Sequence, residues 1–448
     1  MNDSNINDFS KGAVWRRILY QAVPLTIAQL VQLLYNVVDR IYIGHMGDDG
    51  GLALTGIGLS FPVVTLIMAF SALFGIGGVP LFSMERGARN EEKAGKILGN
   101  SFCLLLISSS VLTVLGYIFL KPLLYLFGAS GESVLYAGEY LRIYLAGTVF
   151  SSLATGLNGY ISAQGFPKIG MMSVIIGAVI NIVLDPLFIF AFGMGISGAA
   201  LATVISQAAS AIWVVGFLKS RKSVIPLTLK NIRLQPRIVG SISKLGVSNF
   251  IMQGTNFVVQ VVCNSTLQSY GGDIYVGIMT VANSIREIFM LPLSGVMSGS
   301  QPVISFNYGA KLYDRVKSGI KFNSVAGAVY TAIVWLLVLI FPKFWIGVFS
   351  DDVELINIGT KALTVYFFGF VFMALQFAGQ STFQAVGDAK HAIFFSLLRK
   401  VIIVVPLTVI LPIAGFGVMG VFLAEPVSNI IGGTASYLAM RYTVYKKL

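Results

Sequence analysis

Long apolar stretches separated by short polar segments recur along almost the whole chain. Each stretch is long enough to cross about 30 Å of hydrocarbon as a helix that rises about 1.5 Å per residue. The pattern therefore predicts an all-α polytopic membrane protein with twelve transmembrane helices. The predicted spans are 17–43, 52–82, 97–120, 137–163, 169–193, 196–218, 245–268, 275–305, 320–342, 355–384, 392–414 and 417–440.

The second half of this pattern repeats the first. Moving it back by 222 positions makes four landmarks coincide: Gly309 with Gly87, Gly387 with Gly165, Gly417 with Gly195 and Gly420 with Gly198. A single offset that serves four landmarks indicates an internal duplication. Because six crossings per half is an even number, both halves enter the membrane the same way up. We therefore predict two six-helix bundles related by a pseudo-two-fold axis along the membrane normal, with a cavity between them.

A basic segment separates the two halves. Residues 219–244 carry seven Lys and Arg residues and no acid. We predict an N-terminal six-helix bundle over 1–218, a basic cytoplasmic linker over 219–244 and a C-terminal six-helix bundle over 245–448. The linker is expected to tether the bundles, and its residues 224–236 are expected to tolerate replacement by a flexible chain of equal length while the flanking basic residues are kept.

Composition and charge narrow the class. Hydrophobic residues make up 56% of the chain and charged residues 11%, with a mean hydropathy of +0.81, whereas soluble domains carry roughly 25% charged residues. With the N-terminus inside, 25 of the 31 Lys and Arg residues fall in cytoplasmic segments. The net charge of +12 is thus a topology signal rather than a nucleic-acid site. We expect a multi-pass protein of the cell membrane with both termini in the cytoplasm.

Few ionisable residues lie within the predicted spans, and each is a candidate functional group because charge is costly there. They are Asp39, Arg40, Asp185, Arg286, Glu287 and Glu425. Seven residues separate Gln32 from Asp39, which places both on one helix face. Asn181 and Asp185 are one helical turn apart beside Pro186. The duplicated half has Val261, Ile403 and Leu407 at the positions of Asp39, Asn181 and Asp185.

That asymmetry favours a specific task for the polar set, but structural alternatives remain open. Asp39 could form an ion pair with Arg40 at a helix end. Asn181 and Asp185 could satisfy carbonyls that Pro186 leaves free. Arg286, Glu287 and Glu425 could line the cavity or bond helices together. The acids Glu287 and Glu425, with Tyr35 and Met290 as adaptable apolar surface, favour flat amphipathic cations as substrates.

Several motifs together resemble those of the MATE (multidrug and toxic compound extrusion) transporters. They are 24–44 (PLTIAQLVQLLYNVVDRIYIG), the Gly-Ala-Arg and Gly-Ala-Lys loops at 87–89 and 309–311, Ala163-Gln164-Gly165 and Asn181-Ile-Val-Leu-Asp185-Pro186. The resemblance implies secondary active export of amphipathic, often cationic compounds, driven by inward proton or sodium flux. It also implies a coupling cluster of Gln32, Asp39, Tyr140, Asn158, Asn181, Asp185 and Thr203. Some members carry acids on helices 7 and 10, where this chain has Gln253, Gln260, Gln376 and Gln380.

The residues leave the coupling ion open. A desolvated carboxylate binds a proton more readily than it does in water, so Asp39 and Asp185 could exchange protons with the two sides of the membrane. A sodium ion held by the oxygens of Asp39, Asn181, Asp185 and Thr203 would serve equally, since hard cations prefer oxygen ligands. We expect no cofactor beyond the coupling ion and no catalytic residues. The expected partners are small amphipathic substrates and the lipid bilayer, with no nucleic acid, and the chain is expected to be a monomer.

Three other function classes were weighed. A flippase for lipid-linked saccharides shares the architecture but needs several cations in its cavity, where Arg286 is the firm candidate and Arg40, Arg399 and Lys400 are further ones. A major-facilitator carrier is disfavoured because its Asp-Arg-x-Gly-Arg type loop after helix 2 is missing. A membrane enzyme would need clustered His, Cys or paired acids at one interface, and no such cluster is evident.

Overall fold

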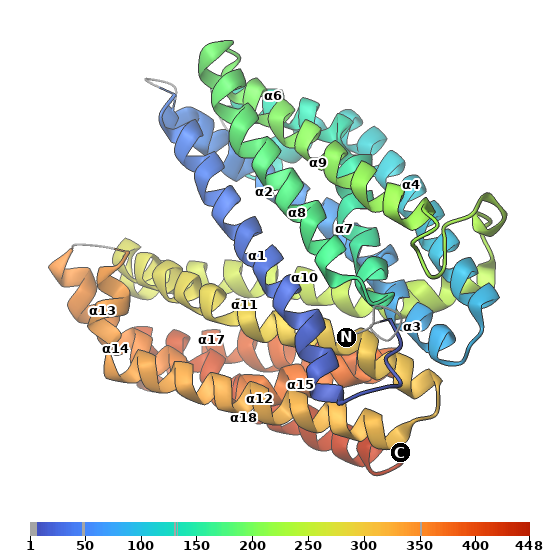
Figure 1. Cartoon of the computed structure of the whole chain (residues 1–448). Helices are drawn as coiled ribbons and strands as arrows, with labels where there is room; N and C mark the ends of the chain where they lie inside the picture. Colours follow the sequence, from blue (N-terminus) through green and yellow to red (C-terminus); the bar gives the residue numbers. More distant parts are fainter. Residues whose placement is uncertain (1–6, 47–49, 130, 132, 350–351) are drawn as a thin grey trace. The chain divides into compact units, whose positions relative to one another are not determined.

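The computed structural model describes residues 7–46, 50–129, 131, 133–349 and 352–448. Every regular element within these ranges is helical (Figure 1). The elements of the first half are α1 (Val14–Gly44), α2 (Gly50–Phe74), η3 (Ile76–Gly78), α3 (Val79–Gly87), α4 (Glu91–Ile118), α5 (Leu120–Leu126), α6 (Ser133–Ala146), α7 (Thr148–Ala163), α8 (Pro167–Pro186), η4 (Leu187–Ala191), α9 (Gly195–Lys219), η5 (Leu229–Asn231) and α10 (Pro236–Gly271).

The second half continues with helices of the same kind. Its elements are α11 (Asp273–Gly309), α12 (Tyr313–Ile340), α13 (Pro342–Gly347), α14 (Val353–Phe367), α15 (Val371–Ala385), α16 (Ala389–Leu397), η6 (Leu398–Val404), α17 (Val405–Leu411), η7 (Pro412–Phe416), α18 (Val418–Met440) and η8 (Arg441–Tyr445).

Each of the twelve predicted spans falls on a helix or on consecutive helices. Among the described residues, nine helical stretches are long and apolar enough to cross a membrane, and the bent pair α14 and α15, with a 44° bend, would make a tenth. The other two predicted spans are α6 with α7, which break at Gly147 into shorter helices, and α10, whose apolar face is interrupted by Gln253 and Gln260. The all-helical membrane architecture predicted from the sequence is confirmed.

The duplication is visible in the backbone. Arg89 and Lys311 both adopt the left-handed conformation, with φ of 58° and 57°, although neither is glycine. Two of the four glycine pairs predicted to correspond also have matching positive φ, 92° and 81° at Gly165 and Gly387, and 57° and 53° at Gly195 and Gly417. Equivalent loops of the two halves therefore turn in the same way.

The chain divides into two compact units, whose boundaries differ from the predicted domains. Unit 1 contains the described residues up to Lys11 and those from Val23 to Asn249, and unit 2 contains Gly12–Ala22 and Phe250–Leu448. The start of α1 belongs to unit 2 because Gly299 and Gly319 present no side chain to it, so the α1 backbone at Ala22 packs closely on α11. Arg315 also donates a hydrogen bond to the Gly12 carbonyl at 2.8 Å.

The segment expected to be a loose linker is docked on unit 1, and α10 already begins at Pro236. Ile225 and Leu227 are buried in the hydrophobic core of unit 1. The buried Gln164 side chain accepts hydrogen bonds from Ser223 Oγ and Ile225 N, both at 2.9 Å. The segment is therefore not a loose tether in this structure, because Ser223, Ile225 and Leu227 are buried and alternate with the exposed Val224, Pro226 and Thr228. That it can be replaced without loss of transport stays a prediction.

The core of unit 1 holds the helices that carry the predicted coupling residues. α9 packs along both α7 and α8, and α6 packs on α2 and α9. The Tyr160 ring packs edge-on against Phe82, and its hydroxyl lies 2.6 Å from Ser101 Oγ. Gly75 and Gly156 meet without side chains, so α7 lies directly against the end of α2. These contacts fix α6, α8 and α9 around the predicted polar set.

Candidate functional site

The first polar centre, in unit 1, is a pair of carboxyl groups from α1 and α8. Asp185 is fully buried near the end of α8, and the carboxyl of Asp39 lies within hydrogen-bonding reach of it. Asn181, one turn earlier on α8, donates a hydrogen bond from Nδ2 to Asp185 Oδ1 at 3.1 Å. The structure thus brings together three side chains singled out in the sequence.

Oxygen atoms in this centre lack donors. Asp39 Oδ1, Asp185 Oδ2 and Asn181 Oδ1 are buried and accept no hydrogen bond from the part of the chain that the structure describes. An unpaired buried acceptor costs free energy, and two facing carboxylates add repulsion. The arrangement suits a bound proton or an oxygen-liganded cation. Within the described ranges no group of three or more His, Cys, Asp or Glu side chains forms a metal site.

Tyr140 and Thr203 join the centre from α6 and α9. Both side chains are buried, and the Thr203 side chain lies close to the Tyr140 hydroxyl. The Tyr140 ring stacks on Tyr144 with centroids 5.9 Å apart, and its hydroxyl is close enough to Asp39 to interact with it electrostatically. Thr203 therefore lies beside Tyr140, and its hydroxyl oxygen has a lone pair left for a cation even when it bonds to a neighbour.

Gln32 and Asn158 lie in a neighbouring cavity of about 140 Å³ rather than at the carboxyl pair. Gln32 Nε2 donates to the Tyr35 hydroxyl at 2.8 Å. Asn158 Nδ2 donates to Ser173 Oγ at 2.8 Å and to the Gly170 carbonyl at 3.0 Å. Tyr35 was expected in the substrate cavity with Arg286, but it lines this small cavity of unit 1 instead, because its position on α1 faces α8.

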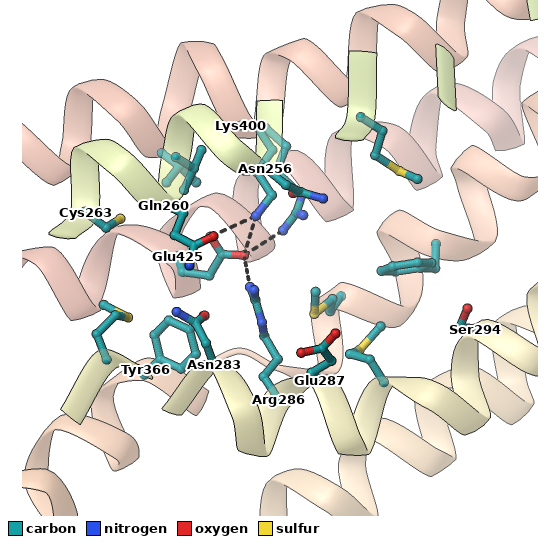
Figure 2. A pocket seen from close by; sticks show the side chains of 18 of the residues that line it. Asn256, Gln260, Cys263, Asn283, Arg286, Glu287, Ser294, Tyr366, Lys400 and Glu425 are labelled. Atoms are coloured by element: carbon teal, nitrogen blue, oxygen red, sulfur yellow. Dashed lines mark hydrogen bonds and ion pairs between the residues drawn. The ribbon is translucent and has the colours of Figure 1, made fainter. Parts of the chain in front are cut away.

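The second polar centre, in unit 2, surrounds Glu425 of α18. Arg286 Nη1 and Arg399 Nη1 each lie 3.0 Å from Glu425 Oε1, and Lys400 Nζ lies 3.1 Å from Oε1 and 3.3 Å from Oε2. Figure 2 shows Arg286 and Lys400 converging on this carboxylate, with Glu287 beside Arg286. Glu425 therefore binds three cations within the protein and does not stand free to attract a cationic substrate.

These groups line a cavity of about 490 Å³ within unit 2. Arg286, Glu287, Met290 and Glu425 line it as predicted for a substrate cavity. The structure adds Arg399, Lys400, Tyr366 and Asn283, which the sequence had not assigned or had left as alternatives. The available signal was the Arg399-Lys400 pair in the middle of an apolar run. Both lie in the π-helical segment η6, a local widening of the helix that is frequent at functional sites.

Comparison with known proteins decides the family. The MatE family model matches residues 24–187 and 245–410, once in each half of the chain. The chain belongs to the MatE family. The two separate matches agree with the predicted duplication.

Curated relatives of this transporter cover nearly its full length. The multidrug export protein MepA of Staphylococcus saprophyticus subsp. saprophyticus is 26% identical over 438 residues, covering 98% of this chain and 96% of the relative. MepA of Staphylococcus haemolyticus is 26% identical over 447 residues, covering 99% and 96%.

Solved structures share the fold of this MATE family member. One is an outward-facing multidrug resistance MATE family transporter of the MOP superfamily, with a TM-score of 0.90 and 24% identity over 98% of both chains. Another is a MATE in complex with MaL6, with a TM-score of 0.91 and 24% identity over 98% of this chain and 99% of the other.

Proposed function

We propose that this MATE family member exports amphipathic, often cationic small molecules by alternating access coupled to inward proton or sodium flux. The observation that carries the proposal is the buried pair of Asp39 and Asp185, whose carboxyl groups face each other with unfilled oxygens. The names of its curated relatives, which describe multidrug export, support the substrate class.

The carboxyl pair gives coupling a physical basis. Two ionised carboxylates within hydrogen-bonding reach of each other repel strongly when buried. A shared proton or a bound sodium ion removes that repulsion. The loaded and empty states then favour different packings of α1 on α8, which biases the opening of the transporter. Asn181 positions Asp185 through its hydrogen bond, and its own Oδ1 is a further sodium ligand.

Everted membrane vesicles test this proposal. Asp39→Asn and Asp185→Asn are each expected to lower dye transport at least tenfold while protein amount in the membrane stays the same. Glu139→Gln is the control, because Glu139 is exposed and, among the described residues, its carboxylate accepts a hydrogen bond only from the Ser197 hydroxyl, at 3.4 Å. Dye transport measured with only a pH gradient, and then with only a sodium gradient, identifies the coupling ion as the one whose gradient drives transport. Transport by both Asn variants equal to the parent would remove the carboxyl pair from coupling.

The protein is proposed to lie in the cell membrane. The distribution of its basic segments favours an orientation with both termini in the cytoplasm. The chain is proposed to act as a monomer. Green fluorescent protein fused after Leu448 is expected to fluoresce, since it folds on the cytoplasmic side of a bacterial membrane. If the fusion does not fluoresce and a reporter that is active only in the periplasm works at the same position, the orientation is the reverse of the proposed one.

A flippase for lipid-linked saccharides is the second candidate. The observation in its favour is that Arg286, Arg399 and Lys400 line one cavity, which meets the expectation of several cations. Against it, Glu425 and Glu287 in the same cavity leave an excess of a single positive charge. Export of anionic lipid-linked sugars without export of ethidium-like dyes would favour the flippase.

A further inference from the structure

The Glu425 cluster has more positive charge than its carboxylate balances. Three cations from α11 and η6 share one carboxylate, and Arg399 turns its Nη1 to Asn429 Oδ1 as well, at 2.7 Å. A buried charge in a membrane-spanning bundle is stable only with a partner close by. The three cationic side chains therefore carry more charge than the single carboxylate to which they bond.

Glu287 does not supply the missing charge by direct bonding. It lines the same cavity, but its carboxylate is exposed and makes no hydrogen bond or ion pair with the described residues. It follows Arg286 on α11, and Figure 2 shows its carboxylate beside the Arg286 side chain without a bond to it. Glu287 interacts electrostatically with Arg286, and the cavity then keeps an excess of one positive charge for an incoming group.

Arg286 presents that charge to the cavity. Its side chain is 25% exposed, against 9% for Arg399 and 6% for Lys400. Of its five N–H donors, only those on Nη1 face a partner within the described part of unit 2, the Glu425 carboxylate. The Tyr366 ring, whose centroid is 5.7 Å from Arg286 Cζ, holds the guanidinium group in place. A planar guanidinium with free donors suits bidentate binding of an oxyanion.

The remaining cavity wall combines polar side chains, those of Asn256, Gln260, Asn283 and Ser294, with a larger apolar and adaptable part. Met252, Met279, Met290, Met373 and Phe377 line it. Thioether side chains fit apolar ligands of varied shape. A ligand that fills the cavity therefore has an apolar body next to its charged group.

We infer that the unit 2 cavity contains an oxyanion-binding site, in which Arg286 binds the carboxylate, sulfonate or phosphate group of an amphipathic molecule. Lys400 stays bonded to both carboxylate oxygens of Glu425. Arg399 stays bonded to Glu425 and Asn429, and Glu425 is the internal counter-ion that keeps the empty site stable. The inference rests on the proposed function only in taking this cavity as the place that holds a transported molecule. It extends the substrates from cations to amphiphiles that carry an oxyanion.

Equilibrium binding to the purified full-length protein in nanodiscs of phosphatidylcholine tests this site. The probes are pyrenebutyrate, its neutral methyl ester and the matched pyrenebutyl-trimethylammonium, which share one apolar body. Pyrenebutyrate is expected to bind at least tenfold more tightly than either. Equal Kd values for the three probes in the parent protein would overturn the site, whatever any variant does.

A variant pair locates the site. Arg286→Gln leaves Glu425 bonded to Arg399 and Lys400, and it is expected to weaken pyrenebutyrate binding at least tenfold with little change for the ester. Arg286→Lys is expected to recover part of the loss. Arg441→Gln, an exposed position on η8, is the control for loss of one positive charge. An Arg286→Gln protein that keeps the parent Kd for pyrenebutyrate would show that the cluster is structural only.

Two further arms separate the sources of the oxyanion. Competition by inorganic phosphate tests a free ion, and nanodiscs that contain phosphatidylglycerol test a lipid headgroup. Selectivity for pyrenebutyrate that persists against both supports an amphipathic solute, whereas displacement by phosphatidylglycerol alone assigns the site to lipid and overturns the solute assignment. Because binding is measured without an ion gradient, its failure leaves the coupling role of Asp39 and Asp185 untouched.

Discussion

The Asp39 carboxyl of α1 lies within hydrogen-bonding reach of the Asp185 carboxyl of α8, and each keeps a buried oxygen without a donor. A pair of this kind is unfavourable for stability when both groups are ionised. Functional sites often hold such unfavourable pairs at the expense of stability.

Asp185→Asn is therefore expected to leave the unfolding temperature in detergent equal to or higher than that of the parent, while coupled transport is lost. The amide can donate to Asp39 and so replaces repulsion with a hydrogen bond. Thermal unfolding followed by intrinsic tryptophan fluorescence measures this. A drop of several degrees would favour the alternative in which Asp185 only satisfies backbone groups near Pro186.

Glu425→Gln is expected to destabilise unit 2 by about 3–5 kcal/mol, because it leaves three buried cations without their carboxylate. The double variant Glu425→Gln, Lys400→Met removes one of those cations and is expected to recover part of the loss. Denaturant or thermal unfolding of the parent, both single variants and the double variant gives the coupling energy. Additive losses in the four proteins would show that Lys400 and Glu425 do not stabilise each other.

Gly246 on α10 lies against the Leu73 carbonyl of α2, where a Cβ atom would overlap with backbone. Gly246→Ala is therefore expected to destabilise unit 1 by about 1–3 kcal/mol. Gly240→Ala on the same helix is the control, because nothing lies within 4 Å of a Cβ there. Its expected effect is neutral or slightly stabilising, since alanine favours helix over glycine. Equal effects of the two changes would show that α10 does not pack on α2 at this point.

The docked segment before α10 offers a matched pair of leucines. Leu227 is 5% exposed and Leu229 is 85% exposed. Leu227→Ala is expected to cost about 2–5 kcal/mol, as for other buried leucines, and Leu229→Ala less than about 0.5 kcal/mol. Unfolding of the two variants under the same conditions measures the difference. Indistinguishable stabilities would restore the interpretation of 219–235 as a loose tether.

The sequence by itself determined the all-helical membrane fold, the duplication and the family. Apolar length sets a membrane span almost independently of tertiary context, because a helix satisfies its own backbone in lipid. The 222-residue offset followed from glycines whose positive φ recurs in both halves. The Asn181–Asp185 bond was also predictable, because a separation of four residues on a helix places side chains together.

Only the tertiary structure decided which residues from different helices meet. Arg286, Arg399 and Glu425 lie far apart in sequence, and their convergence depends on how α11, η6 and α18 pack. The sequence left open whether Glu425 lines the cavity or bonds helices together, because side-chain pairing across helices leaves no periodic signal. For the same reason the sequence grouped Tyr35 with Arg286, whereas the structure places Tyr35 in the smaller cavity of unit 1, and the docked segment was expected to be loose. Local spacing predicts contacts within a helix, whereas contacts between helices depend on rotations about their axes that no spacing encodes.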